Sequence, residues 1–500
     1  MKVLSLFFLI YNSMKYLESY KIFENRGSSL VEKLDKLISP LIKRGDVSGV
    51  NVGIYKDNKE LVLRSWGYSN LELDIKLRPD NVFEIASITK QFTAAAIMQL
   101  VEAGKLDLDD NIKKWIKIDT RDKKITVRNL LGHTAGFGFP MPGTPNLKNT
   151  ITKNGRKIDV SWKELDVNLD EILKNIKRII EIGEQYDSLF EPGDEQLYSN
   201  YGFILLSFII EKASGRTYQD YIQKNIFDKV GMKSSYSGQV DGIIKNKVTG
   251  YERKNIGEGK ELRFDKDNVL VKSRTNKLNS ILGCGDIQST VSDLHKWNQF
   301  LHGGKLFSNQ TYEEYIKQTQ LNWGQITREA KGLGVTDWNG KKLFFHAGGI
   351  DGFSSMNFYF PQDKISVIVL INTSGFQIPR YSNNFDTGLS HGLESYIANH
   401  ASHWVYNMDV KSIDNFSGEE EVMFSGDLDK YVGFYKHSSQ MTLEFIKVGK
   451  KLHLNFNKSK KSVPLYYIGR DTFSEGDFYL KFRGKEVHLD APGGYMIFKK

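Results

Sequence analysis

A serine and a lysine three residues apart form the first candidate for chemistry. They lie in the segment Phe83-Glu84-Ile85-Ala86-Ser87-Ile88-Thr89-Lys90, and no other serine of the chain has a lysine three positions later. At the start of a helix this spacing places both side chains on one face, one turn apart. A buried lysine with a lowered pKa accepts the serine proton and makes the hydroxyl a nucleophile. The alternative is a capping serine followed by a surface lysine.

A phenol and an amide form the second candidate, in Tyr198-Ser199-Asn200, just before an apolar stretch. The phenol can move a proton to a leaving group, and the amide can orient a lysine or a substrate carbonyl. The same tripeptide recurs at Tyr68 and Tyr381. Tyr68 follows a predicted strand and Tyr381 lies in a polar loop. Their surroundings therefore favour Tyr198 as the catalytic tyrosine.

Glycines after a histidine form the third candidate, in His346-Ala347-Gly348-Gly349. Glycines at a strand edge let the backbone approach a ligand, and their N–H groups can stabilise an oxyanion. The alternative is a strand-ending turn with a structural histidine. For the similar His302-Gly303-Gly304, which follows an apolar helical run, the end of a helix is the better interpretation.

The elements that must position these residues come from both ends of the chain. Apolar periodicity predicts helices over 29–43, 87–103, 172–182, 201–213 and 385–401, and strands over 50–55, 61–66, 343–346, 353–360 and 365–372. The pattern indicates one discontinuous α/β domain over 28–408, an antiparallel sheet flanked by helices, with an inserted helical lobe at about 105–275. The polar excursion 138–170 is expected to line the cleft.

The composition changes after the last of these elements. An acidic run, Glu419-Glu420-Glu421, falls in a predicted linker at 409–427, and short alternating stretches follow over 428–500. This alternation predicts a small antiparallel β-barrel. We expect it to be a separable module that the chemistry does not need.

Composition limits the other classes of function. The 500 residues carry 69 Lys and Arg against 60 Asp and Glu, and these charges are scattered without the basic stripe of a nucleic-acid-binding protein. His400 and His403 lack a third metal ligand, so neither a metal nor another cofactor is expected. The single cysteine, Cys284, is expected to be a packing residue.

A basic start and a short apolar run at 3–10 suggest a leader within residues 1–27. A leader would make this a secreted, periplasmic or cell-surface protein; a cytoplasmic location is the alternative.

Together, the three candidates resemble the serine β-lactamase and D,D-peptidase superfamily, in its class C-like and esterase-like branch. Three further segments are similar to segments of that superfamily. Residues 101–110 resemble the turn that follows its nucleophile segment, Leu-Leu-Gly-His-Thr-Ala-Gly at 130–136 resembles its His-Thr-Ser-Gly loop, and 285–294 resembles its Gly-Gly-x-x-Ser-Thr turn and helix. Tyr431-Val432-Gly433-Phe434-Tyr435 resembles the lipocalin-like module often appended to such enzymes. His133, in the second of these segments, is expected to be structural.

The resemblance implies Ser87 as nucleophile, Lys90 as its partner and Tyr198 as general base and acid. Asn200 and His346 would contact substrate, while the N–H groups of Ser87 and Gly349, with Gly348 beside them, would form the oxyanion hole. Ala347 lacks the hydroxyl that helps bind a β-lactam carboxylate, and a histidine is mostly neutral at pH 7.

The expected function is therefore a serine hydrolase that forms an acyl-enzyme with an ester, amide or lactam. An esterase or D-amino-acid peptidase is favoured over a dedicated penicillinase. The expected partner is a small-molecule or peptide (peptidoglycan-like) acyl substrate, not nucleic acid; membrane association and oligomeric state stay open. The alternative function is a catalytically silent binding or scaffold protein.

Overall fold

The computed structural model describes most of the chain. The described residues are 28–137, 149–153, 156–160, 188–240, 242–255, 268–375, 392–408, 424, 426–438, 441–457, 462–469, 471–475, 478–491 and 494–500. The possible leader, the predicted helix 172–182, Tyr381 and most of the predicted linker lie outside these ranges, as does most of the excursion 138–170. Within that excursion, β5 (Asn149–Lys153) and β6 (Arg156–Val160) form an antiparallel hairpin.

A seven-stranded antiparallel sheet joins the two ends of the α/β part of the chain, residues 28–408. Its order is β12-β13-β14-β15-β1-β2-β3, so β1 pairs with β15 from more than 300 residues later, with Val52 opposite Val369. The strands are β1 (Gly49–Lys56), β2 (Lys59–Asn70), β3 (Ile75–Lys76), β12 (Gly334–Trp338), β13 (Lys341–Ile350), β14 (Phe353–Phe360) and β15 (Ile365–Ile371). This pairing confirms the predicted mixed α/β fold with its antiparallel sheet. The central position of β15 follows from its sequence, Ile-Ser-Val-Ile-Val-Leu-Ile, which is buried throughout.

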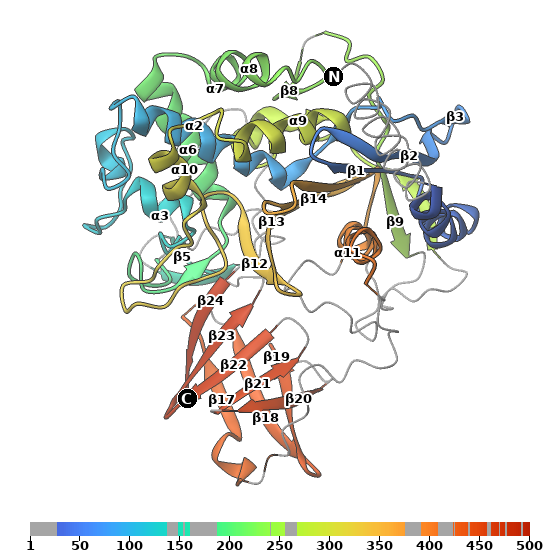
Figure 1. Ribbon diagram of the computed structural model, residues 1–500. Helices are drawn as coiled ribbons and strands as arrows, with labels where there is room; N and C mark the ends of the chain where they lie inside the picture. Colours follow the sequence, from blue (N-terminus) through green and yellow to red (C-terminus); the bar gives the residue numbers. More distant parts are fainter. Residues whose placement is uncertain are drawn as a thin grey trace, which may run out of the picture.

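Helices cover both faces of the sheet (Figure 1). On one face, the helix at 28–43 and α11 (Leu393–Val405) bury Leu34, Ile38 and Ile397 against strand residues such as Val52 and Phe358. On the other face lies α9 (Val291–His302), whose Leu294 and Trp297 pack in a second core. The predicted helix at 385–401 therefore continues to Val405, and its predicted start lies outside the described residues.

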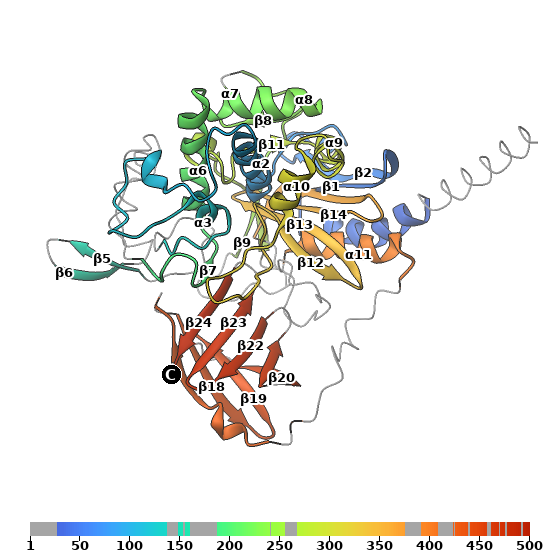
Figure 2. The same cartoon turned by 60° about the vertical axis from the view of Figure 1, so that its left-hand side comes forward.

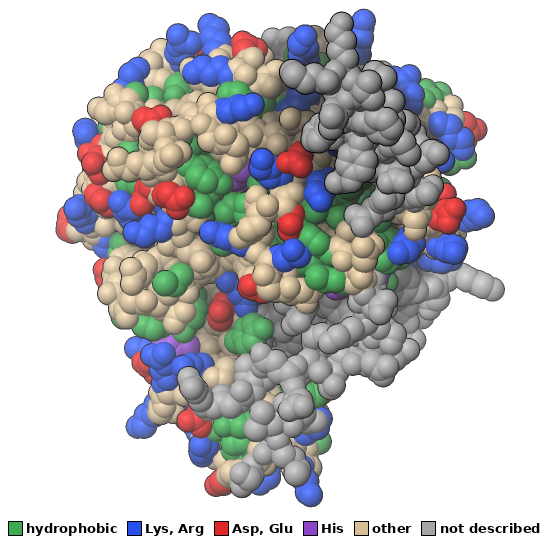
Figure 3. All heavy atoms as spheres, viewed as in Figure 1, with side chains coloured by type: hydrophobic (Ala, Val, Ile, Leu, Met, Phe, Trp, Pro, Cys, Tyr) green, Lys and Arg blue, Asp and Glu red, His purple; other side chains and the backbone are tan. Residues whose placement is uncertain are grey.

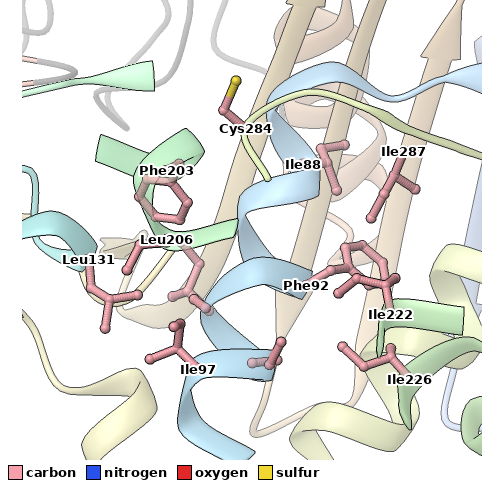
Figure 4. Close-up of a cluster of buried hydrophobic side chains, with 14 of the residues drawn as sticks. Ile88, Phe92, Ile97, Leu131, Phe203, Leu206, Ile222, Ile226, Cys284 and Ile287 are labelled. Atoms are coloured by element: carbon pink, nitrogen blue, oxygen red, sulfur yellow. The ribbon is translucent and has the colours of Figure 1, made fainter. Parts of the chain in front are cut away.

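The second core surrounds α2 (Thr89–Glu102), from which Phe92 and Ile97 point to opposite sides into the cluster (Figure 4). Nearly all of its residues are buried, the polar Lys90 and Gln91 included. The other helical elements are α3 (Val127–Leu131), α6 (Asn200–Ser214), α7 (Tyr218–Ile222), α8 (Asp228–Val230), α10 (Asn309–Ile316), and the single turns η1 (Ala86–Ile88), η2 (Ile112–Lys114), η3 (Gln223–Phe227) and η4 (Leu278–Ser280).

The helix predicted from about 87 to 103 is α-helical only from Thr89, because Ser87 lies in the 3₁₀ turn η1, which runs directly into α2. Ala86 precedes Ser87 with a φ of 46°, which an α-helix does not permit. Short strands also escaped prediction: β4 (Phe83–Glu84), β8 (Tyr236–Ser237), β9 (Tyr251–Asn255), β10 (Asn268–Lys272), β11 (Ile287–Ser289) and β16 (Thr373–Ser374).

The C-terminal residues form a closed eight-stranded antiparallel barrel, as predicted. It begins with the turn η6 (Leu428–Lys430). The strands are β17 (Gly433–Lys436), β18 (Thr442–Val448), β19 (Lys451–Phe456), β20 (Val463–Gly469), β21 (Thr472–Glu475), β22 (Phe478–Arg483), β23 (Glu486–Ala491) and β24 (Gly494–Lys499). Lys436 of β17 pairs with Lys499 of β24 and closes it. A ninth strand, β7 (Gln196–Leu197), belongs to the α/β part and pairs with the other end of β24 (Figure 2).

Positive and negative side chains are interspersed over the face of the molecule in Figure 3, in agreement with the scattered charges of the sequence. Among the described helices, none combines the length and apolar character that crossing a bilayer requires.

Candidate active site

The turn that carries Ser87 is fixed from three sides. The N–H of Ile85 donates to the carbonyl of Ile287, and the N–H of Ile287 donates to Oγ1 of Thr89. On the third side, β13 passes so close that a Cβ on Gly348 would collide with the carbonyl oxygen of Ile85. Ser87 itself is partly exposed. The turn therefore presents its hydroxyl at the surface from a rigid base.

Lys90 is fully buried beneath this hydroxyl. Its Nζ donates to Oγ of Ser87 at 3.1 Å, to Oδ1 of Asn200 at 2.7 Å and to the carbonyl oxygen of Cys284 at 2.8 Å. Burial lowers the pKa of Lys90 to about 8, and the nearby carboxyls of Glu329 and Asp286 oppose that shift. The structure thus brings Ser87, Lys90 and Asn200 together, as the sequence predicted.

Tyr198 lies against the same lysine. Nζ of Lys90 is 4.7 Å from the centre of the phenol ring. Burial is the main cause that holds the pKa of Tyr198 well above its usual value, and a hydrogen bond with the Ser87 side chain opposes it. At neutral pH the phenol is protonated and in contact with the Ser87 hydroxyl.

His133 holds the chain on both sides of Tyr198. Its carbonyl accepts from the N–H of Leu197, and its ring Nδ1 accepts from the N–H of Ser199 at 3.1 Å. A ring nitrogen that accepts is unprotonated, so the proton of the neutral ring is on Nε2. Burial and the charge of Lys90 hold the pKa of His133 well below its usual value. These contacts give His133 the structural role that the sequence indicated.

His346 faces the site from β13, with its ring centre 6.4 Å from that of Tyr198. Its Nδ1 lies 2.6 Å from the carbonyl oxygen of Ala347 and must donate to it, because a carbonyl only accepts. Burial and the charge of Lys90 lower the pKa of His346 to about 3. The ring is therefore neutral, and its Nε2 is a hydrogen-bond acceptor rather than a cation.

The second half of β13 has a free edge beside Ser87. β12 pairs with β13 only as far as Phe345, whereas β14 pairs with it as far as Ile350. Residues 346–350 are therefore bonded on one side only among the described strands. Gly349 is exposed, and a Cβ there would meet nothing within 4 Å. An extended ligand has room to approach this edge.

The sequence interpretation missed two groups of the site. The first is the carbonyl of Cys284, which no motif marks because any residue type carries one. The second is Glu329, whose pKa burial raises to about 7 while the charges of Lys90 and Arg328 oppose the shift. The turn after Glu329 packs on α2, since a Cβ on Gly332 would collide with the Lys90 backbone. An isolated glutamate in a loop gives no sequence signal.

The other candidates lie apart from the site. Tyr68 is on β2, where its ring stacks under the ammonium of Lys76 at 3.7 Å. His302 ends α9 and bonds the hydroxyl of Tyr312, as a helix-ending residue. His400 and His403 contact backbone carbonyls of their own helix. Over the described ranges no cluster of three or more His, Cys, Asp or Glu is arranged to hold a metal ion.

Gly132 stands where the resembled family usually has serine. A Cβ at this position would lie 2.7 Å from Oγ1 and 2.9 Å from Cγ2 of Thr319. The side chain of Thr319 therefore occupies the space that a serine would need.

Comparison with known proteins places this geometry in a family. The family model described as Beta-lactamase matches residues 34–385. Protein flp of Staphylococcus aureus (strain N315) is 24% identical over 365 residues, which are 71% of this chain and 66% of that protein. Penicillin-binding protein 4* of Bacillus subtilis (strain 168) is 29% identical over 316 residues, 62% of this chain and 64% of that protein. The chain thus spans just under two thirds of these relatives.

Two solved structures share the fold. The octameric penicillin-binding protein homologue from Pyrococcus abyssi is 25% identical with a TM-score of 0.60, and the match covers 94% of this chain and 100% of that chain. The D-amino acid amidase from Ochrobactrum anthropi SV3 is 22% identical with a TM-score of 0.58, and the match covers 76% of this chain and 99% of that chain. The protein belongs to the Beta-lactamase family, whose members are usually serine hydrolases.

Proposed function

We propose that this protein is a serine hydrolase in which Ser87 attacks an acyl carbonyl and Lys90 takes the serine proton. The observation that carries the proposal is the set of three acceptors around Lys90 Nζ: the oxygens of Ser87, Asn200 and Cys284, at 3.1, 2.7 and 2.8 Å.

The protons of Lys90 support this assignment. A neutral amine has two N–H groups and one lone pair. The oxygens of Asn200 and Cys284 can only accept from Lys90, so they take the two N–H groups. The lone pair then faces Ser87, whose hydroxyl is the one neighbour of the three that can donate. Loss of a proton from Lys90 therefore turns it into a base aimed at Ser87.

Tyr198 complements the lysine. A phenol whose pKa is raised by burial keeps its proton at neutral pH. It is therefore suited to donate to the leaving group when the tetrahedral intermediate collapses, and to accept a proton again from the water that releases the acyl group. The N–H groups of Ser87 and Gly349 are the proposed oxyanion donors, because they flank the open edge of β13.

The substrate proposed is an ester or an amide, including a peptide of D-amino acids, rather than a β-lactam. A β-lactam presents a carboxylate beside the reacting ring. The resemblance assigns recognition of that carboxylate to the positions of His346, which is neutral with a pKa of about 3, and Ala347, which has no hydroxyl. An acceptor at Nε2 of His346 instead suits a substrate N–H or O–H group.

The alternative is a binding or scaffold protein that has lost its chemistry. Ser87, Lys90 and Tyr198 are all present and in mutual contact, whereas a silent protein has no need of a buried lysine under a serine. Burial of that lysine costs free energy unless the site uses it.

The test compares hydrolysis of p-nitrophenyl acetate, a D-alanyl anilide and a chromogenic cephalosporin by the wild type, Ser87→Ala and Ser65→Ala. Ser65 is the matched control, because its buried hydroxyl has no hydrogen-bond partner among the described residues. We expect turnover of the ester or anilide by the wild type and the control, a much lower rate with the cephalosporin, and none with Ser87→Ala. Equal rates for Ser87→Ala and the wild type would overturn the proposal.

A further inference from the structure

The C-terminal barrel is bonded to the strand that leads into Tyr198. β7 consists of Gln196 and Leu197, and it pairs with the first residues of β24, Tyr495 and Gly494. The other end of β24 closes the barrel against β17. One strand thus belongs both to the barrel wall and to the segment that carries the proposed proton-transfer residue (Figure 2).

The opposite edge of the same segment is bonded to the α/β part. The N–H of Gly193 donates to the carbonyl of Thr134, and the N–H of Leu197 donates to that of His133. Residues 193–197 therefore lie between two partners, the His133 loop and the barrel. Because backbone hydrogen bonds fix register, the position of Tyr198 depends on both sides.

Glu195 is the polar link between the two parts. One of its carboxylate oxygens, Oε2, accepts from the backbone N–H of Ile497 at 2.7 Å and lies 2.9 Å from Nε2 of His437. The side chain of His437 has no exposed surface and that of Glu195 has 12%. Without these donors the mostly buried carboxylate would lack hydrogen bonds. Without the carboxylate, the Ile497 N–H and the His437 ring would lose their acceptor, and either loss costs free energy.

Apolar packing joins the same two parts. Phe190 and Leu197, from the segment before Tyr198, belong to the hydrophobic core of the barrel, together with residues such as Tyr435, Leu443 and Phe498. Two side chains from outside the barrel, Phe190 and Leu197, are therefore part of its core.

A second contact lies beside the first. Trp323 donates from Nε1 to the carbonyl of Asp194 and packs its ring against His488 and Tyr495 of the barrel. Arg328 forms an ion pair with Asp490 at 3.4 Å. The loop that contains both residues also contains Glu329, so the barrel touches two segments that reach the site.

From these contacts we propose that the barrel holds Tyr198 in its working position, and that Glu195 is the positioning residue through which it does so. This reverses the expectation of a dispensable module and rests on the proposed function of Tyr198. A displacement of about 1 Å at a reacting group lowers turnover by up to about a hundredfold. Loosening the β7–β24 contact should therefore lower kcat while leaving KM almost unchanged.

The experiment measures kcat and KM of the full-length protein with a D-alanyl anilide, because its amine leaving group must take up a proton, whereas p-nitrophenolate leaves without one. Glu195→Ala should lower kcat at least about tenfold with KM within about twofold. Glu195→Gln keeps an oxygen that accepts from the Ile497 N–H, so it should recover most of the loss. The matched control is Asp429→Ala, which removes an exposed carboxylate elsewhere on the barrel, paired with Lys447, and should behave as wild type.

A double-mutant cycle separates positioning from general damage to the fold. In a Tyr198→Phe background there is no hydroxyl to position, so Glu195→Ala should change the remaining rate by less than about twofold. The same loss in both backgrounds, or a wild-type kcat for Glu195→Ala, would overturn the inference. If the wild type itself has no serine-dependent turnover, the proposed function fails instead, so the two failures are distinct.

Discussion

Nζ of Lys90 lies closer to Oδ1 of Asn200, at 2.7 Å, than to Oγ of Ser87, at 3.1 Å. Asn200 is the first residue of α6, and Ser199 caps that helix by accepting from the N–H of Gly202. The amide therefore has a fixed position and directs one N–H of the lysine away from the serine. The protonation of Lys90 should then decide whether Ser87 reacts.

The first prediction is a rise of activity with pH. The pKa of Lys90 is about 8, so the amine is mostly protonated at pH 7 and mostly neutral at pH 9. Only the neutral amine can accept the serine proton, so kcat/KM should increase with pH, reach half its maximum near pH 8 and level off above it. A profile that is flat from pH 6 to 9, measured with p-nitrophenyl acetate, would contradict the role of Lys90.

The second prediction concerns Glu329. The ionised carboxylate favours the protonated form of Lys90 and so raises its pKa. Glu329→Gln removes that charge at nearly constant size, so the pKa of Lys90 should fall and the half-maximal pH should move to a lower value. Glu313→Gln, on the exposed side of α10, removes the same charge away from the site and should leave the profile unchanged. A half-maximal pH that moves to a higher value in Glu329→Gln would contradict the predicted effect of this carboxylate on the pKa of Lys90.

The third prediction compares Tyr198 with Tyr68, which begins the same Tyr-Ser-Asn tripeptide. Tyr198→Phe removes only the hydroxyl and should lower kcat about a hundredfold, the usual effect of losing a general acid or base. Tyr68→Phe should stay within a few-fold of wild type, because its ring stacks under Lys76 on β2. A similar loss of kcat in both variants would contradict the assignment of Tyr198 as the catalytic tyrosine. Tyr381, outside the described residues, is predicted to behave like Tyr68.

The fourth prediction compares two neighbouring glycines. A Cβ on Gly348 would collide with the carbonyl of Ile85 and with Oγ of Ser355, whereas one on Gly349 would meet nothing within 4 Å. Gly348→Ala should therefore lower the free energy of unfolding by about 1–3 kcal/mol or more, as overpacking does. Gly349→Ala should leave it nearly unchanged. Thermal or urea unfolding measures both, and equal stability of the two variants would contradict the close approach of β13.

Much of the α/β part could be predicted from local patterns. The Ser87 and Lys90 pair, the apolar helix after Tyr198 and the buried run of β15 each carry their signal within a few residues. Periodicity and spacing are local properties, so they are visible in the chain before it folds.

The contacts that were missed are long-range or made by the backbone. β7 is two residues long and finds its partner, β24, almost 300 residues later, so no hydrophobic pattern marks it. The positive φ of Ala86 reflects the fit of its turn between β11 and β13. The expectation of a separable barrel came from the change in composition after residue 409, which does not reveal the pairing of β24 with β7; that the chemistry does not need the barrel stays a prediction.

The central claim, a covalent intermediate on Ser87, is tested most directly by intact-mass spectrometry with peptide mapping. The full-length protein is treated with a fluorophosphonate, which loses fluoride as the serine oxygen bonds to phosphorus. We predict one adduct per chain, located on the peptide that contains Ser87, formed faster at pH 9 than at pH 7 and absent from Ser87→Ala. An adduct on another residue, or the same adduct mass in Ser87→Ala, would contradict the account.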